Sequence, residues 1–90
     1  MSDPGWSVRL ATSARRDIKR LDPPIRERVL NAIDGLRTQP PAGDIKRLAG
    51  QEPPEWRLRV GEWRVRFARD PATRTVVIQR VLPRGRAYRD

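Results

Sequence analysis

The chain has 90 residues, with 20 Lys and Arg against 11 Asp and Glu, so its net charge is +9. This length fits one domain, residues 1–90, with a small core, and this charge attracts polyanions. The chain has no cysteine and no histidine, which excludes disulfides, thiolate nucleophiles, histidine triads and His/Cys zinc sites. It has no signal-peptide pattern and no apolar run of about 20 residues, so we expect a cytoplasmic protein.

The first part of the chain predicts one strand and two helices. Apolar and polar residues alternate over 6–10, which is typical of a half-buried strand. Thr12-Ser13 is expected to cap a first helix, and Asp22 a second helix with Pro23-Pro24 in its first turn. The short break between them predicts a helical hairpin. Its apolar stripes are expected to be Ala14, Ile18, Leu21, Ile25, Val29, Leu30, Ala32, Ile33 and Leu36.

The second part of the chain predicts a sheet. Residues 44–48 fit either a turn or a short strand, whereas 56–60 and 63–67 both alternate with a period of two. Gly61-Glu62 between them fits a two-residue hairpin loop of type II′. Residues 75–82 are apolar enough to form a central strand. The prediction is an α+β fold in the order β-α-α-β-β-β, with an antiparallel sheet packed on an N-terminal helical hairpin.

The hairpin places its arginines on one face of the sheet. A two-residue loop makes Arg59 face Arg64 and Arg57 face Arg66, while the tryptophans at 56 and 63 fall on the apolar side and are assigned to the core. No carboxylate is expected opposite these arginines, and like charges directly opposite each other destabilise a sheet. One interpretation is a solvated basic surface in an arginine-rich protein. The other is a face that binds a polyanion, because phosphates would turn this repulsion into charge-assisted hydrogen bonds.

The tail adds further candidate residues. Tyr88, the only tyrosine, is flanked by Arg84, Arg86 and Arg89. It is either a packing residue or a functional one, which stacks on a base or, as a phenolate favoured by nearby charge, acts as a general base. The acids are scattered, so no metal site and no cofactor is expected. RNA cleavage by its own 2′-OH needs no metal, only a base, an acid and cations around the phosphorane.

Three segments resemble the RelE/ParE toxin family. They are Ile45–Gly50, Trp56–Val65 and Val81–Tyr88, which follow the family patterns K-L-x-G, [YW]-R-x-R-x-G-x-[YW]-R and [HP]-R…Y. The resemblance covers nearly the whole chain and implies the toxin of a type II toxin–antitoxin pair, with a cognate antitoxin as its protein partner. It also implies a RelE-like α+β fold.

RelE-like members are ribosome-dependent endoribonucleases that cleave mRNA by 2′-OH attack. By position, the resemblance implies catalytic roles for Arg64, Arg84 and Tyr88. It implies phosphate binding by Arg57 and Arg59, and we expect the same of Arg66 and Arg86. The best-known enzyme has lysines where this chain has Arg57 and Arg59, and arginine is a poor proton carrier.

Two other functions remain open at this point. ParE-like members share the fold and inhibit DNA gyrase without nuclease activity. A basic RNA-binding module without toxicity would also account for the net positive charge. Arg64, Arg84 and Tyr88 occurring together favour the RelE branch.

Overall fold

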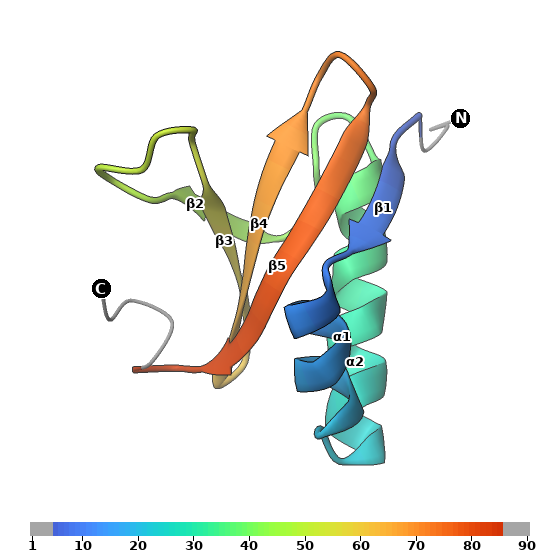
Figure 1. The fold of residues 1–90 in the computed structure, drawn as a ribbon. Helices are drawn as coiled ribbons and strands as arrows, with labels where there is room; N and C mark the ends of the chain where they lie inside the picture. The colour runs from blue at the N-terminus through green and yellow to red at the C-terminus, as the bar shows by residue number, and fades with distance from the viewer. Residues whose placement is uncertain (1–4, 86–90) are drawn as a thin grey trace.

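A computed structural model describes residues 5–85 (Figure 1). Two helices precede four of the five strands, which confirms the predicted α+β class with a helical hairpin in its N-terminal half. The strand order in the sheet is β1-β5-β4-β3-β2. The elements are β1 (Ser7–Leu10), α1 (Thr12–Lys19), α2 (Pro23–Asp34), a 3-10 helix (Gly35–Arg37), β2 (Asp44–Arg47), β3 (Trp56–Val60), β4 (Trp63–Asp70) and β5 (Thr75–Pro83).

The two helices begin close to where the sequence predicts, but neither has a side-chain cap. The residue before α1 is Ala11, so the prediction that Thr12-Ser13 caps this helix is wrong: α1 already begins at Thr12. Asp22 does precede α2, and two prolines follow it, yet its carboxylate makes no capping hydrogen bond. The guanidinium of Arg26 on α2 instead donates to carbonyls at the end of α1, including that of Leu21 at 2.8 Å. This bond ties the hairpin together.

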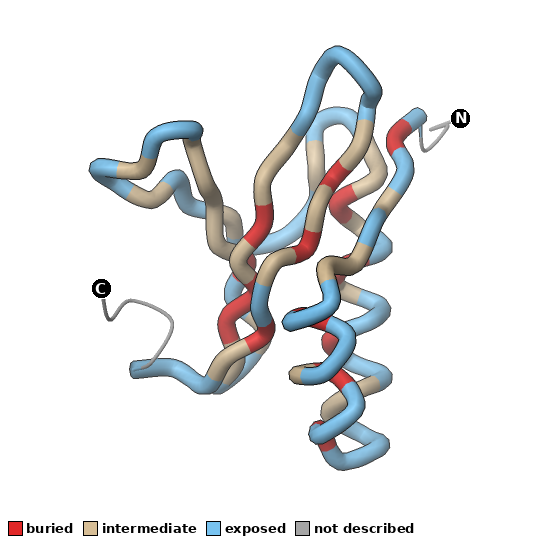
Figure 2. Tube along the Cα trace, in the orientation of Figure 1, coloured by how far each residue is buried: buried red, intermediate tan, exposed pale blue. Residues whose placement is uncertain are grey.

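The core lies between the helices and one face of the sheet (Figure 2). Most of the predicted helical stripe is buried there, but Leu30 is 40% exposed, so its assignment to the stripe is wrong. Leu30 directly follows the buried Val29, and consecutive residues of a helix point in different directions. Its side chain therefore faces solvent, because α2 packs on the sheet with one side only. The buried apolar residues are Trp6, Ala14, Ile18, Leu21, Val29, Ile33, Leu36, Leu58, Val65, Phe67, Val76, Ile78 and Val81.

The sheet is larger than the predicted antiparallel meander. Residues Asp44–Arg47 form a strand, β2, that pairs with the outer edge of β3. At the other edge, β1 pairs with β5 in parallel, with Ser7 opposite Thr75. Parallel pairing joins segments that are far apart in sequence, so no local signal reveals it. Strand β5 therefore lies between β1 and β4, which confirms its predicted central place.

The β3–β4 hairpin has the predicted register. Val60 pairs with Trp63 across the two-residue turn, and Arg59 with Arg64. Gly61 has φ +58°, and within residues 5–85 Arg74 is the sole non-glycine residue with positive φ. Positive φ at the first turn position alone fits the predicted type II′ turn, whose twist matches that of the strands. The turn thereby sets which side chains share a face.

Candidate nucleic-acid interface

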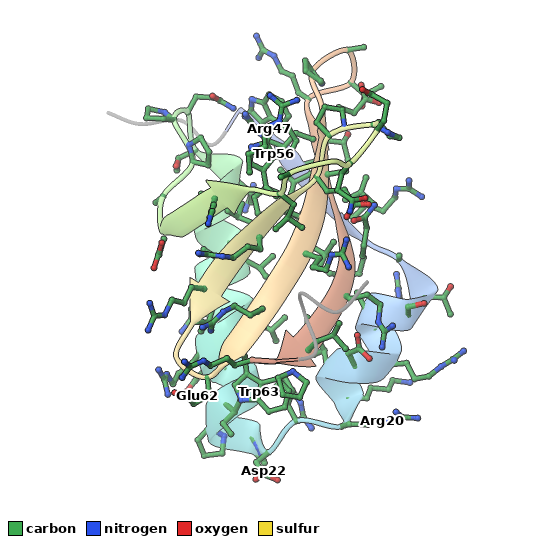
Figure 3. All side chains as sticks on the ribbon, turned by 90° about the vertical axis from the view of Figure 1, so that its left-hand side faces the viewer. Arg20, Asp22, Arg47, Trp56, Glu62 and Trp63 are labelled. Atoms are coloured by element: carbon green, nitrogen blue, oxygen red, sulfur yellow. The ribbon has the colours of Figure 1, made fainter. Side chains whose placement is uncertain are left out.

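The face of the sheet turned away from the helices is strongly basic, and we call it the open face. Because successive side chains of a strand point to opposite faces, the neighbours of the buried Leu58 and Val65 lie on this side. Figure 3 looks onto it, with α2 behind the sheet. Its charged residues are Asp44 and Lys46 of β2, Glu55 just before β3, Arg57 and Arg59 of β3, Arg64 and Arg66 of β4, and Arg80 of β5, the register partner of Arg66.

The rung nearest the turn joins one exposed arginine to one buried arginine. Arg59 is exposed, whereas its partner Arg64 is only 5% exposed. The Nη1 atom of Arg64 donates to the carbonyl oxygens of Gly61 at 2.8 Å and Trp63 at 2.9 Å. The hairpin turn therefore holds the Arg64 guanidinium at a fixed position, close to the place where the chain reverses.

The next rung joins Arg57 to Arg66, and carboxylates accompany both. Arg57 Nη1 lies 3.5 Å from Asp44 Oδ1, and Arg66 Nη2 lies 2.6 Å from Glu55 Oε1. Asp44 is also the register partner of Arg59 on β2. The sequence-based view that no carboxylate opposes these arginines is therefore wrong. It failed because residues 44–47 were not placed in the sheet.

Glu55, Asp44 and Lys46 were missed as members of this face. For Glu55 a signal existed: it stands two residues before Arg57 and so extends the same side of the strand. For the two β2 residues the signal was absent, because a four-residue segment fits a turn equally well.

Arg84 lies at the turn end of the open face. Its backbone N–H donates to the Glu62 carbonyl oxygen at 2.8 Å, and its Nη1 is 3.9 Å from Glu62 Oε1. Both side chains are largely exposed. The chain therefore leaves β5 beside the same turn that holds Arg64. The other two predicted tail residues, Arg86 and Tyr88, lie outside the described residues.

The two strand tryptophans belong to the helix side of the sheet, as predicted. Trp56 stacks on Phe67 with ring centroids 6.2 Å apart, and Trp63 packs against the buried core. Both are partly exposed, at opposite ends of the β3–β4 hairpin (Figure 3). They contribute apolar burial and leave the open face to charged groups.

The open face has more cations than anions. Lys46, the four hairpin arginines and Arg80 carry six positive charges. The carboxylates of Asp44 and Glu55, with that of Asp17 paired to Arg80, leave an excess of three among the described residues. The Nε atom of Arg66 is buried and has no hydrogen-bond acceptor within residues 5–85. Buried, incompletely paired guanidinium groups are costly, and a bound anion would offset that cost. Chemically, this face can bind and neutralise phosphate.

Residues 5–85 contain no cluster of three or more side chains suited to hold a metal ion. None of the described helices is long and apolar enough to cross a membrane.

Comparison with known proteins gives both a family and solved relatives. A model of the ParE toxin of the parDE type II toxin–antitoxin system matches residues 8–88. No curated protein matches. The RelBE2 toxin–antitoxin complex from Mycobacterium tuberculosis contains a chain that is 33% identical, with a TM-score of 0.75; the match covers 89% of this chain and 99% of that one.

Two archaeal complexes are also similar. The RelB–RelE antitoxin–toxin complex from Methanococcus jannaschii matches at 25% identity and a TM-score of 0.72, covering 89% of this chain and 94% of that one. The RelE–RelB complex from Pyrococcus horikoshii OT3 has a TM-score of 0.78 at 23% identity, covering 91% and 98%, and supports the fold alone. Because the family match extends over nearly the whole sequence, this chain belongs to the ParE toxin family, and it is a type II toxin of the RelE/ParE superfamily.

Proposed function

We propose that this toxin is a metal-independent endoribonuclease that cleaves mRNA on the ribosome and so inhibits translation. The observation that carries the proposal is the open face, where an excess of positive charge surrounds the hairpin arginines. Such a face attracts nucleic-acid phosphates and binds them with charge-assisted hydrogen bonds. Arginine suits this task because its planar fork matches a phosphate bidentately and stays charged at any working pH.

The chemistry assigned to this face is a transesterification within the RNA strand. The ribose 2′-oxygen attacks the adjacent phosphorus and the bond to the 5′-oxygen breaks, which gives a 2′,3′-cyclic phosphate and a 5′-hydroxyl. The 2′-OH proton passes to a base, and the leaving 5′-oxygen takes up a proton. Cations stabilise the charge that develops on the phosphorane.

Arg64 and Arg84 are proposed to hold the scissile phosphate, since both lie beside the Gly61-Glu62 turn. Arg57, Arg59, Arg66 and Arg86 are proposed to bind phosphates of the strand. Arginine hardly deprotonates, so Tyr88 is proposed either as the general base or as a stacking platform for a nucleobase.

A second candidate function is inhibition of DNA gyrase without nuclease activity. One observation favours it: the family model that matches is that of ParE. The burial of Arg64 also fits it, because a guanidinium bonded to its own turn contributes to the fold whether or not RNA binds.

Induction of the toxin in cells, followed by mapping of mRNA 5′ ends, separates the two functions. The nuclease predicts new 5′ ends within translated codons and early arrest of protein synthesis. The gyrase inhibitor predicts intact mRNA with a DNA-damage response and filamentation. Growth without a defect would contradict both functions.

Variants refine this test. Arg59→Ala should abolish mRNA cleavage, and Tyr88→Phe should abolish it if Tyr88 is the general base but retain it if the ring only stacks. Arg15→Ala on the outer side of α1 should retain cleavage, although it also removes one positive charge. Arg59→Ala is preferable to Arg64→Ala, because Arg59 is exposed and Arg64 supports the turn. Full cleavage by both Arg59→Ala and Tyr88→Phe would contradict the site.

We also propose a cognate antitoxin as the protein partner of this chain. The three solved structures reported above are complexes of a RelE toxin with a RelB antitoxin. A short acidic protein encoded beside this gene, whose co-expression restores growth, would support the pairing. Failure of every neighbouring reading frame to neutralise the toxin would contradict it.

A further inference from the structure

The two arginine rungs of the open face form a ladder with a regular step. Arg59 faces Arg64, and Arg57 faces Arg66, two residues further along both strands. Two residues of an extended strand advance about 6.6 to 6.8 Å. A single nucleic-acid strand presents phosphates at a comparable repeat when its backbone is extended. The ladder therefore offers two neighbouring positions for phosphate rather than one broad positive surface.

The rung formed by Arg57 and Arg66 is held in place before any ligand binds. The side chain of Arg57 is 14% exposed and lies beside Asp44, and that of Arg66 is 21% exposed and is paired with Glu55. These contacts restrict the rotamers of both arginines before a ligand binds, so that binding costs less side-chain entropy. Glu55 contacts the Nη2 atom of Arg66, and the Arg66 Nε has no acceptor within residues 5–85.

The two rungs differ in how their arginines are supported. In the rung nearer the turn, Arg64 is bonded to turn carbonyls and Arg59 is exposed. In the other rung, both arginines have a carboxylate within 3.5 Å. The carboxylates fix the Arg57/Arg66 rung, which suits a position that holds the strand beside the reacting phosphate. The rung near the turn lies beside Arg84, whose backbone N–H is bonded to the Glu62 carbonyl.

We infer that the open face contains two consecutive phosphate subsites along one nucleic-acid strand. The rung Arg59/Arg64 takes the scissile phosphate and the rung Arg57/Arg66 takes the adjacent one. This inference rests on the proposed function and adds to it the minimal ligand: a single strand with two adjacent phosphodiesters, lying along β3 and β4. A one-phosphate ligand fills a single rung.

The test measures binding of 2′-O-methyl oligoribonucleotides, which lack the nucleophile and are not cleaved. Fluorescence anisotropy of the purified full chain gives Kd for labelled ligands with one, two and three phosphodiesters. The second phosphate should tighten binding about tenfold and the third by much less, because charged hydrogen bonds of one added rung account for roughly that factor. Equal gains for every added phosphate would overturn the inference in favour of diffuse attraction.

Variants assign the gain to the second rung. In the double variant Arg57→Ala/Arg66→Ala, the tenfold gain in affinity from the second phosphate should fall below about twofold. The slope of log Kd against log salt concentration should fall by about 0.7, which is the contribution of one phosphate of a single strand. The matched control Arg15→Ala/Arg16→Ala removes the same charge from exposed positions of α1 and should retain the gain. Equal loss in both pairs would overturn the inference.

Arg57 and Arg66 are partly buried, so their replacement by alanine can also destabilise the fold. Single variants to glutamine, which keeps a long polar side chain, control for this effect. Arg57→Gln and Arg66→Gln should each reduce the second-phosphate gain to about threefold, whereas Arg15→Gln and Arg16→Gln at exposed positions of α1 should retain the full gain. A change in the one-phosphate Kd alone would overturn the inference. Absence of binding to ligands of every length would contradict the proposed function as well, whereas length-independent binding contradicts only the two subsites.

Discussion

The carboxylate of Asp17 on α1 accepts a hydrogen bond from the backbone N–H of Val81 on β5, with an Oδ2–N distance of 2.8 Å. Strand β1 pairs with β5 only as far as Ile78, so the edge of β5 beyond it lacks a strand partner. Asp17 replaces that partner and also binds Arg80, whose Nε is 2.9 Å from Oδ2. One helical side chain thus closes the sheet edge and fixes α1 against it.

Asp17→Ala should destabilise the fold by about 2 kcal/mol, because it leaves the part-buried N–H of Val81 without an acceptor. Urea denaturation measures the effect. Asp34→Ala is the matched control: its carboxylate is 70% exposed and is paired with Arg37 one turn further on, so its loss should cost less than about 0.5 kcal/mol. Equal losses in the two variants would contradict the edge-closing role of Asp17.

The same carboxylate makes stability depend on pH. Burial raises the pKa of Asp17, but hydrogen bonds from Arg80 and the Val81 N–H, with the charges of Arg80 and Arg20, outweigh it and leave the pKa below the ordinary 3.8. The unfolded chain therefore takes up this proton more readily than the native one. The stabilisation is complete above about pH 4 to 5 and is lost as the pH falls through the lower, native pKa. Denaturation between about pH 5 and 2 should give a flatter stability curve for Asp17→Asn than for the parent chain.

Arg64→Ala and Arg59→Ala should separate folding from binding. Arg64 is 5% exposed and bonds two carbonyls of the turn, so its loss should lower the free energy of unfolding by about 1 to 3 kcal/mol. Arg59 is exposed, so its loss should stay within about 0.5 kcal/mol while weakening RNA binding. Thermal unfolding and RNA titration of both variants measure this. A stable Arg64→Ala would show that the turn does not depend on its guanidinium.

Arg26→Ala should loosen the helical hairpin. Its guanidinium donates to the carbonyls of Ile18, Lys19 and Leu21 at 3.3, 3.2 and 2.8 Å, where α1 ends without a glycine cap. We expect a loss of about 1 to 2 kcal/mol, and faster exchange of the α1 amides with solvent than of the β4 amides. Glu27→Ala, on the exposed side of the same helix, is the control. Uniform acceleration of exchange would contradict a local role of Arg26.

The sequence predicted the hairpin register because a two-residue turn, with apolar and charged residues alternating on both strands, allows one pairing of the strands. It also predicted the helical stripes at Ala14, Ile18 and Val29, which are buried. It did not predict the partners of β1 and β2, since pairing between distant segments leaves no local period. Asp44 of the open face was missed for that reason. Only the fold around Asp44 brings its carboxylate near Arg57.

The parallel pairing of β1 with β5 has a consequence for synthesis. Residues 7–10 can form strand hydrogen bonds only after residues 75–78 have been synthesised. Strand β5 also pairs with the edge of β4 that is otherwise unpaired. Contacts of such long sequence separation form late, because loop closure precedes them. A nascent chain therefore carries its arginine hairpin on an unfinished sheet until β5 has been made. A chain that stops before β5 lacks the strand that joins β1 to β4.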